Sequence, residues 1–250
     1  MNAFFECRGL GRSFGALVAV ADVTLQVAKG EVRAVIGPNG AGKTTFFNLL
    51  TGVLKPTTGR VLRDGADLTG RPVEEIVQRG ISRTFQLTAL FPGLSALENC
   101  RLAAQARRPG RWRFLGGGPL FAETRRMATE ALERGRRADL ADTPAGLLSH
   151  GDQRLLEVAM ALAQGPDILL LDEPTQGLSI EETERTVQVL RELLADGDLT
   201  VLLVEHDMEV VFRLAHRIAV LHRGRLIADG VPEAVRADPA VQDAYLGGLD

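Results

Sequence analysis

The stretch "GPNGAGKT" at residues 37–44 constrains the fold of this chain more than any other feature. It matches the pattern G-x-x-x-x-G-K-[ST], follows the short apolar strand "VRAVIG" and precedes the helical stretch "KTTFFNLLTGVL". Its glycines let backbone N–H groups turn toward a phosphate, which the positive end of the helix also attracts. Because strand and helix stand in the required places, the stretch predicts a phosphate-binding loop rather than a glycine-rich turn with a chance lysine.

The side chains of this loop predict nucleotide binding together with a divalent cation. The ammonium group of Lys43 is expected to bind the β- and γ-phosphates, and the hydroxyl of Thr44 is expected to bind Mg²⁺. Thr45 adds a hydroxyl for a phosphate oxygen. The remaining nucleotide-binding candidates in the loop are Gly37, Asn39, Gly40, Ala41 and Gly42.

Two later apolar strands end in polar side chains that suit nucleotide hydrolysis. In "ILLLDEP" (168–174), Asp172 can hold Mg²⁺ through water, and Glu173 can orient or deprotonate an attacking water. In "VLLVEHD" (201–207), His206 ends a strand where ligands of open α/β sheets bind, so we expect it to contact a γ-phosphate. The simpler alternatives are a polar turn before a proline and an ordinary surface or core histidine.

The order of elements predicts an α/β fold. The first thirty residues alternate like strands, and hairpins are expected at Asp64–Gly65 and around Gly224. From residue 168 onward apolar strands alternate with amphipathic helices, which favours a mostly parallel sheet covered on both faces. Helical stretches dominate between about residues 88 and 148, so we expect an inserted helical subdomain.

Composition excludes several classes of protein. A net charge of −3 and a pI of about 5.9 disfavour a nucleic-acid binder. Cys7 and Cys100 suggest no disulfide framework and fit a reducing cytosol. The N-terminus lacks the apolar region of a signal peptide, and the longest apolar runs are too short to cross a bilayer. We therefore expect a cytosolic protein, unless a partner brings it to a membrane.

The stretch "LLSHGDQRLLEVAMAL" (147–162) identifies a more specific family. Its second half predicts a helix, with Ser149 as N-cap and Asp152 three residues on, but capping does not require Gly151. "LSHGDQR", a helix, "ILLLDEP" and a histidine after the next strand follow one another as in an ATP-binding cassette, and the resemblance covers essentially the whole chain. "LSHGDQ" is similar to the cassette signature "LSGGQ", with His150 for the first glycine and Asp152 inserted before Gln153.

The resemblance implies the architecture and the remaining site residues. It implies one cassette over residues 1–250, with an α/β ATPase core and N-terminal antiparallel part at 1–87 and 156–250 and a helical subdomain at 88–155. In the family, the signature binds ATP held by another cassette in a head-to-tail dimer. The resemblance therefore assigns Ser149, Gly151 and Gln153 to the ATP held by the other cassette. The glycine lets the backbone approach the γ-phosphate of that ATP closely.

Three further positions are assigned only by the resemblance. Gln86 in "RTFQ" resembles the glutamine that reaches Mg²⁺ and the attacking water. Phe14 in "SFGAL" resembles the aromatic that stacks on adenine, the alternative being an ordinary core phenylalanine. Ser179 in "QGLS" stands where many cassettes carry an aspartate, at the position of a cross-dimer contact.

Softer motifs suggest which cassette this is. "ISRTFQ", "VEHDMEVV", "RIAVLHRGRLIADGVPEAVRADPAV" and the terminal "AYLG" resemble ATPase subunits of branched-chain amino acid and urea importers. The lipopolysaccharide-export ATPase is the nearest alternative. Cassette ATPases of DNA repair or translation are a different class, disfavoured because the helical insert is short and the chain has one P-loop and one signature.

The resemblance also implies the partners. We expect transmembrane permease subunits, a homodimer or a heterodimer with a paralogous ATPase, a periplasmic or extracellular solute-binding protein acting indirectly, and no nucleic acid. The expected location is the inner face of the cell membrane. The segment 107–121 mixes arginines with Trp112, Phe114 and Phe121, so we expect it to face the membrane or the permease, or else to be a solvated loop.

Overall fold

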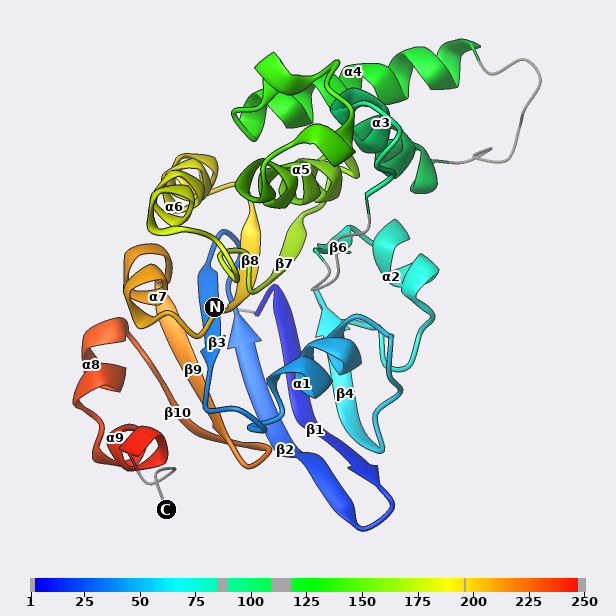
Figure 1. Ribbon diagram of the computed structural model, residues 1–250. Helices are drawn as coiled ribbons and strands as arrows, with labels where there is room; N and C mark the ends of the chain where they lie inside the picture. The colour runs from blue at the N-terminus through cyan, green and yellow to red at the C-terminus, as the bar shows by residue number, and fades with distance from the viewer. Residues whose placement is uncertain (1–2, 85–89, 109–117, 196, 247–250) are drawn as a thin grey trace. The chain divides into compact units, whose positions relative to one another are not determined.

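The computed structural model describes residues 3–84, 90–108, 118–195 and 197–246. The chain forms two compact units. The first unit comprises residues 1–79 and 197–250, and the second comprises residues 80–196. Figure 1 shows the helices and strands of each unit along the chain.

An antiparallel sheet forms one part of the first unit, with strand order β2-β1-β4-β5. Its strands are β1 (Phe5–Phe14), β2 (Leu17–Val27), β4 (Thr58–Arg63) and β5 (Ala66–Asp67). Asp64 and Gly65 join β4 to β5 with positive φ angles of 47° and 77°. A two-residue hairpin turn needs these angles because they match the right-handed twist of the flanking strands. The predicted hairpin is therefore confirmed.

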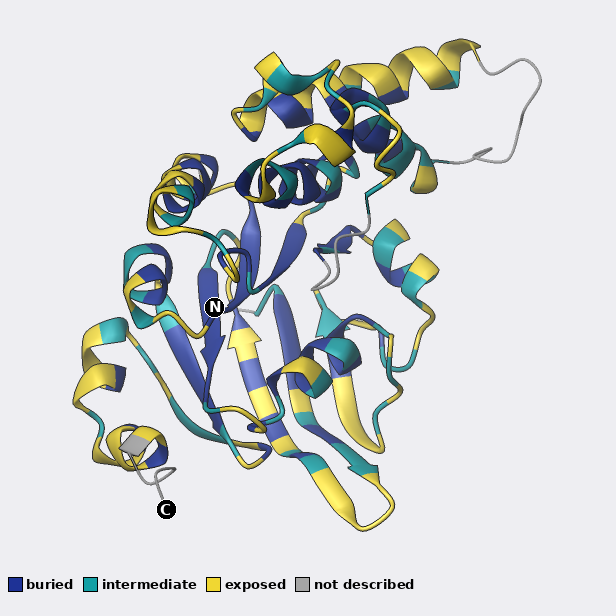
Figure 2. Ribbon diagram, in the orientation of Figure 1, coloured by how far each residue is buried: buried dark blue, intermediate teal, exposed yellow. Residues whose placement is uncertain are grey.

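A second sheet of the first unit carries the phosphate-binding loop. Its strands are β3 (Val32–Ile36), β8 (Thr200–Val204), β9 (Arg217–His222) and β10 (Arg225–Gly230). β3 pairs in parallel with both β8 and β9, whereas β10 returns antiparallel to β9 through the predicted turn at Gly224. Every residue of β3 and β8 is buried, which explains why both strands are continuously apolar (Figure 2).

Five helices complete the described part of the first unit. They are α1 (Lys43–Leu50), α2 (Val73–Gln78), α7 (Met208–Leu214), α8 (Pro232–Ala237) and α9 (Pro239–Leu246). α1 is shorter than the predicted stretch to Leu54, because Gly52 adopts a left-handed φ of 74° that a helix cannot continue through. Val235 of α8 and Val241 of α9 join the apolar cluster that includes Ala34 and Ile36 of β3.

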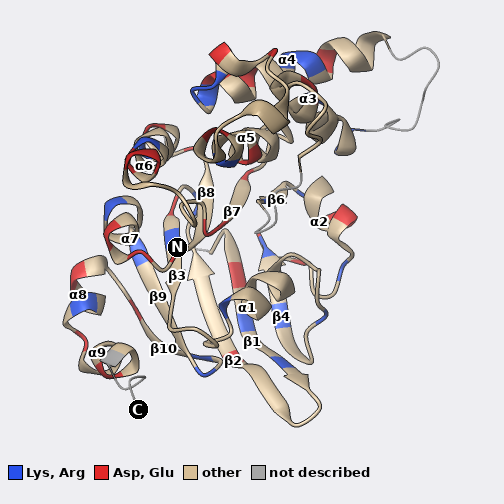
Figure 3. Ribbon diagram, viewed as in Figure 1, with Lys and Arg blue, Asp and Glu red and all other residues tan. Residues whose placement is uncertain are grey.

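The second unit combines two parallel strands with helices. β6 (Ile81–Arg83) pairs in parallel with β7 (Ile168–Asp172). The helices are α3 (Ala96–Ala106), α4 (Gly118–Arg134), α5 (His150–Ala163) and α6 (Ile180–Leu194), and short 3-10 turns lie at Ala138–Leu140 and Ala145–Leu147. α3, α4 and α5 pack against one another, and α4 and α6 present both signs of charge (Figure 3).

These elements confirm the predicted fold class: parallel strands, a separate antiparallel β part, and helices concentrated between residues 96 and 163. The second unit is wider than the predicted helical subdomain at 88–155, because it also holds β6, β7 and α6. The assignment of residues 1–250 to a single cassette stays a prediction. Among the described residues, no helix is both long and apolar enough to span a membrane.

Candidate functional site

The phosphate-binding loop lies in the first unit, between buried β3 and α1. Lys43 is 9% exposed, and its Nζ donates hydrogen bonds to the carbonyl oxygens of Gly37 at 2.6 Å and Pro38 at 3.2 Å. The ammonium group therefore points back into the loop, where phosphate oxygens could take over as acceptors. Thr44 is exposed and Thr45 half-buried on the first turn of α1, so both hydroxyl groups begin the helix as predicted.

Two glycines of the loop are required for different reasons. Gly42, the N-cap of α1, has φ 99°, and a Cβ there would lie 2.4 Å from the carbonyl oxygen of Ala19. Gly40 has φ 77°, but a Cβ there would meet nothing within 4 Å. Gly42 is therefore fixed by close backbone packing as well as by conformation, whereas Gly40 is fixed by conformation alone.

The C-terminal helix α9 lies beside this loop. A hollow of about 550 Å³ is bordered by residues 38–41 of the loop, by His222, Arg223 and Ile227, and by Ala240, Asp243 and Ala244 of α9. The backbone of Gly37 is hydrogen-bonded to the Tyr245 hydroxyl, and burial raises the pKa of Tyr245 to about 12 despite that bond. In the sequence Tyr245 stands out only as part of "AYLG", since nothing local indicates a partner 208 residues away.

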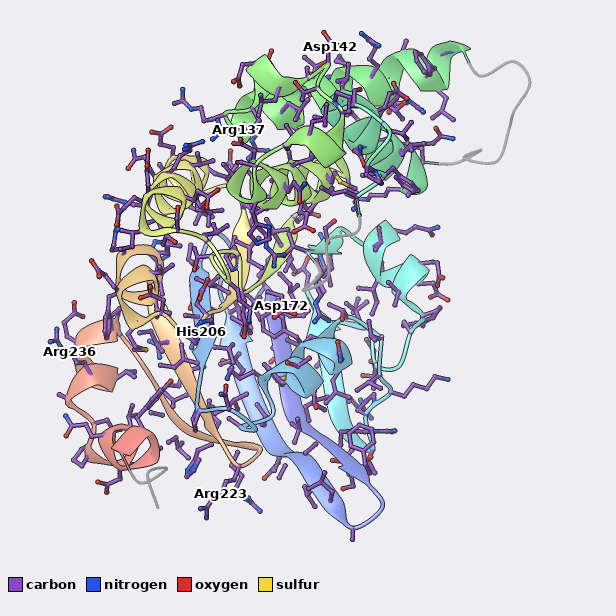
Figure 4. The ribbon with its side chains drawn as sticks, viewed as in Figure 1. Arg137, Asp142, Asp172, His206, Arg223 and Arg236 are labelled. Carbon is purple, nitrogen blue, oxygen red and sulfur yellow. The ribbon has the colours of Figure 1, made fainter. Side chains whose placement is uncertain are left out.

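His206 follows β8 in the first unit (Figure 4). Its side chain is 56% exposed, and its Nδ1 lies 3.9 Å from Oε2 of buried Glu205. The backbone N–H of His206 donates to the same carboxylate oxygen at 3.1 Å. The exposed imidazole is thus anchored at the carboxyl end of a parallel strand, which is compatible with its predicted phosphate contact.

Asp172 ends β7 in the second unit (Figure 4) and is held by a buried ion pair. Its Oδ2 accepts a hydrogen bond from Arg83 at 2.6 Å, and its backbone N–H donates to Thr84 Oγ1 at 3.2 Å. Its other oxygen, Oδ1, is buried and has no hydrogen-bond partner among the described residues. A buried carboxylate oxygen without a partner is costly unless it binds a ligand, and carboxylate oxygens suit Mg²⁺. Asp172 therefore fits the predicted cation, while Arg83 is a partner that the sequence analysis missed.

Glu173 has an unusual backbone. Its φ of 50° is in the left-handed region, which costs a residue with a side chain about 1–2 kcal/mol relative to the right-handed conformation. Its side chain is half-buried between Asp172 and buried Pro174. Such strain concentrates at functional positions because it fixes where a side chain points. The strain is compatible with a functional role, and the assignment of Glu173 as general base stays a prediction.

The signature helix α5 begins as predicted, with Ser149 as its N-cap accepting a hydrogen bond from the backbone N–H of Asp152 at 3.1 Å. Gln153 turns toward the preceding loop, where its Nε2 donates to the carbonyl oxygens of Ala145 and Leu148 at 3.2 and 3.3 Å. Gln153 therefore holds the signature loop in place in this structure. Its assignment to the nucleotide stays a prediction.

The backbone N–H of Gly151 donates to Oε1 of Glu182, on α6, at 3.0 Å. Glu182 also completes a capping box with Ser179, the residue that replaces the expected aspartate. Hydrogen bonds from the backbone N–H groups of Ser179 and Gly151 hold the pKa of Glu182 below its usual value. Glu182 was not among the predicted site residues, although Ser179 and Glu182 have the spacing of a capping box.

Phe14 does not lie in the core. Its ring is 43% exposed at the end of β1, and the Arg12 guanidinium lies over it at 4.7 Å from the centroid. The core alternative is therefore wrong, and adenine stacking stays a prediction. The predicted role of Gln86 falls outside the described residues.

The inserted segment is described only at its ends, because residues 109–117 lie outside the described ranges. Arg107 donates to the carbonyl oxygen of Gln164 at 2.9 Å, and Arg108 forms an ion pair with Glu123 at 3.0 Å. Phe121 is 47% exposed, with the Arg101 guanidinium over its ring. Both ends of the segment therefore contact other residues of the second unit. The predicted role of the segment toward a permease stays a prediction.

Comparison with known proteins adds sequence and structural relatives. Residues 20–176 match the family model of the ABC transporter, and residues 225–250 match that of the branched-chain amino acid ATP-binding cassette transporter. The chain is 42% identical over 249 residues to the high-affinity branched-chain amino acid transport ATP-binding protein BraF of Pseudomonas aeruginosa, covering 97% of both chains. It is 42% identical to LivG of Escherichia coli, which has the same descriptive name, over 96% of both chains.

Solved structures of ABC transporter cassettes are also similar to this chain. The ADP conformation of an ATP-binding cassette from an ABC transporter superposes with a TM-score of 0.86 and 30% identity, covering 99% of this chain and all (100%) of that one. A dimeric bacterial ABC transporter cassette superposes with a TM-score of 0.77 and 29% identity, covering 91% of this chain and 98% of the other.

Proposed function

Because this chain belongs to the ATP-binding cassette family of ABC transporters, we propose that it is the ATP-hydrolysing subunit of an importer of branched-chain amino acids or a related small polar solute. The observation that carries hydrolysis is the end of β7, where Asp172 keeps a buried carboxylate oxygen without a partner in the described structure. The strained Glu173 follows directly. A cation ligand and a general base thus stand next to each other in the chain.

Each candidate residue has a chemical task in this proposal. Lys43 transfers its hydrogen bonds from the loop carbonyls to the β- and γ-phosphates of ATP. Thr44 and Asp172, together with Gln86, would hold Mg²⁺, which when bound neutralises phosphate charge. Glu173 accepts the proton of the attacking water, a contribution of roughly 10²–10⁴-fold in rate.

The second half of the proposal concerns a partner cassette. Ser149 and Gly151 begin a helix of 14 residues, whose N-terminus favours a phosphate. We assign them to ATP held by a second cassette, either a copy of this chain or a paralogous subunit. Dimeric solved cassettes support this arrangement. Closure of the dimer would move the helical part of each cassette and pass that motion to the permease.

The solute and the location follow from the relatives. The two curated relatives are named for branched-chain amino acid transport, and the C-terminal match at 225–250 bears the same description, which favours import over lipopolysaccharide export. The proposed assembly comprises transmembrane permease subunits with this chain bound at the inner face of the membrane, and a periplasmic or extracellular solute-binding protein that acts through the permease. We propose no nucleic-acid partner.

Replacing the general base tests the proposal. Glu173→Gln keeps the size and hydrogen-bonding capacity of the side chain but cannot accept a proton, so ATP turnover should fall by about 10²-fold or more while ATP binding persists. The variant should accumulate as an ATP-bound dimer on a sizing column. Glu74→Gln, which removes the same charge from an exposed position on α2, is the control. Turnover of Glu173→Gln equal to that of the control would remove Glu173 from its role.

A further inference from the structure

The N-terminus of the signature helix already contacts carboxylates of its own chain. The backbone N–H of Gly151 donates to Oε1 of Glu182 at 3.0 Å, and the Ser149 hydroxyl donates to Oδ2 of Asp152 at 2.8 Å. These two groups are the ones that the proposed function assigns to the phosphate of a partner's ATP. An anion is thus present on each donor before any nucleotide arrives.

Glu182 is held firmly in this position. Its second oxygen, Oε2, accepts hydrogen bonds from the backbone N–H and the hydroxyl of Ser179, both at 3.1 Å. The carboxylate therefore bridges the first turn of α6 and the first turn of α5. Its lowered pKa, caused first by the bond from the Ser179 backbone and then by that from Gly151, keeps it charged at neutral pH.

The two carboxylates differ in how their charge is balanced. Asp152 forms ion pairs with Arg137 at 2.9 Å and Arg185 at 3.4 Å. Glu182 instead accepts its hydrogen bonds from uncharged backbone and hydroxyl groups, which lower its pKa most, and nearby His150 adds a smaller electrostatic lowering. Glu182 consequently presents the less compensated negative charge to an approaching phosphate.

Gly151 makes this contact possible. A Cβ at this position would lie 3.0 Å from both Cγ and Oε1 of Glu182, tighter than ordinary packing allows. The glycine that capping could not explain therefore admits a carboxylate of its own chain. The same opening is the one through which a γ-phosphate would reach the N–H group.

From this geometry we propose that Glu182 occupies the phosphate position of the signature helix in the free subunit and must be displaced when two subunits close on ATP. This inference rests on the proposed function, because it requires a phosphate to bind at Gly151 from a partner. Glu182 then sets the ATP concentration at which closure occurs. It is a positioning residue that competes with the γ-phosphate and touches no reacting atom.

The effect on closure is measured with charge-removing variants in the Glu173→Gln background, which does not consume ATP. Glu182→Gln retains both the capping box and an acceptor for Gly151 while losing the charge. The ATP concentration for half-maximal dimerisation should fall about threefold to tenfold, the size expected for removing an anion beside a helix N-terminus and a phosphate. Glu181→Gln, one residue away and exposed, removes an equal charge and should leave the midpoint unchanged.

The outcomes separate this inference from the proposed function. If the Glu173→Gln parent dimerises with ATP but Glu182→Gln and Glu181→Gln share its midpoint, the role of Glu182 is refuted and the proposed function stands. If the parent fails to dimerise at saturating ATP and Mg²⁺, pairing of this chain with itself is refuted instead.

The bond itself is testable in a single subunit without nucleotide. The amide proton shift of Gly151 should follow the titration of Glu182, with a midpoint below the usual glutamate pKa. Glu182→Gln should abolish that titration, and Glu181→Gln should preserve it. A Gly151 amide that is insensitive to pH over the carboxylate range would overturn the inference whatever the dimerisation result.

Discussion

The phosphate-binding loop offers a quantitative test at two glycines that differ in one respect. Gly40→Ala and Gly42→Ala both place a Cβ on left-handed backbone, at φ 77° and 99°. This conformational change alone costs about 1–2 kcal/mol. At Gly40 the new methyl group meets nothing within 4 Å, so the loss should end there.

Gly42→Ala carries an additional steric cost. Its Cβ would lie 2.4 Å from the Ala19 carbonyl oxygen and 3.5 Å from Cα of Gly224, and both neighbours are backbone that cannot rotate away. Overpacking of this kind costs about 1–3 kcal/mol more. The total loss of folding free energy should therefore be about 2–5 kcal/mol.

Thermal unfolding of the two variants and the wild type measures the difference. For a chain of this size 1 kcal/mol shifts Tm by about 2–4 °C, so Gly42→Ala should melt roughly 4–20 °C below the wild type and Gly40→Ala roughly 2–8 °C below it. Nucleotide is left out because a ligand that binds the folded state would add its own stabilisation. Equal losses, or a larger loss for Gly40→Ala, would refute the packing account of the loop.

Three other expectations follow from buried groups and from the inserted segment. Burial raises the pKa of Cys7 and of Cys100 to about 12, so neither thiol should react with a disulfide reagent in the native state, and fast labelling at neutral pH would contradict their burial. The stability that the two buried, uncharged thiols contribute is complete below pH 9 and is lost as pH rises toward 12. Asp172→Asn leaves buried Arg83 without its anion and should cost about 3–5 kcal/mol in urea unfolding, whereas a loss below 1 kcal/mol would deny the ion pair any structural role. Deleting Pro109–Pro119 should leave ATP-driven dimerisation intact but lower ATPase coupling in permease-containing membranes, and unchanged transport would reduce the segment to a tolerated insertion.

The sequence predicted those features whose cause is local. The loop at 37–44, the Asp64–Gly65 hairpin and the Ser149 cap each depend on residues within a few positions of one another, so their spacing alone indicates them. The end of α1 was misplaced because one left-handed glycine overrides an apolar pattern that continues past it.

Contacts between distant residues were not predictable in the same way. Arg83 reaches Asp172 across 89 positions, and Gly151 reaches Glu182 across 31, and neither partner is indicated by its neighbours in the chain. The strand β6 was not predicted because a strand of three residues is too short to show a periodic pattern. The backbone strain at Glu173 is likewise a property of the folded chain, since glutamate by itself does not favour positive φ.

The central claim is that each subunit completes the ATP site of another, and mixing two inactive variants tests it most directly. Lys43→Ala removes the phosphate cation, and Gly151→Asp puts a carboxylate beside the signature N–H and crowds the Glu182 side chain that holds that position. Each variant alone should hydrolyse little ATP. In a mixed dimer, one P-loop and one signature remain intact and face each other.

An equal mixture forms mixed dimers in about half of all pairings, each with one working site of two, so ATPase activity should recover to at most about a quarter of the wild-type value per chain. Differently tagged chains verify that mixed dimers form. Recovery toward that ceiling, absent from either variant alone, is the result that the account predicts. Mixed dimers that form with ATP and yet hydrolyse no more than the separate variants would contradict the shared, head-to-tail site.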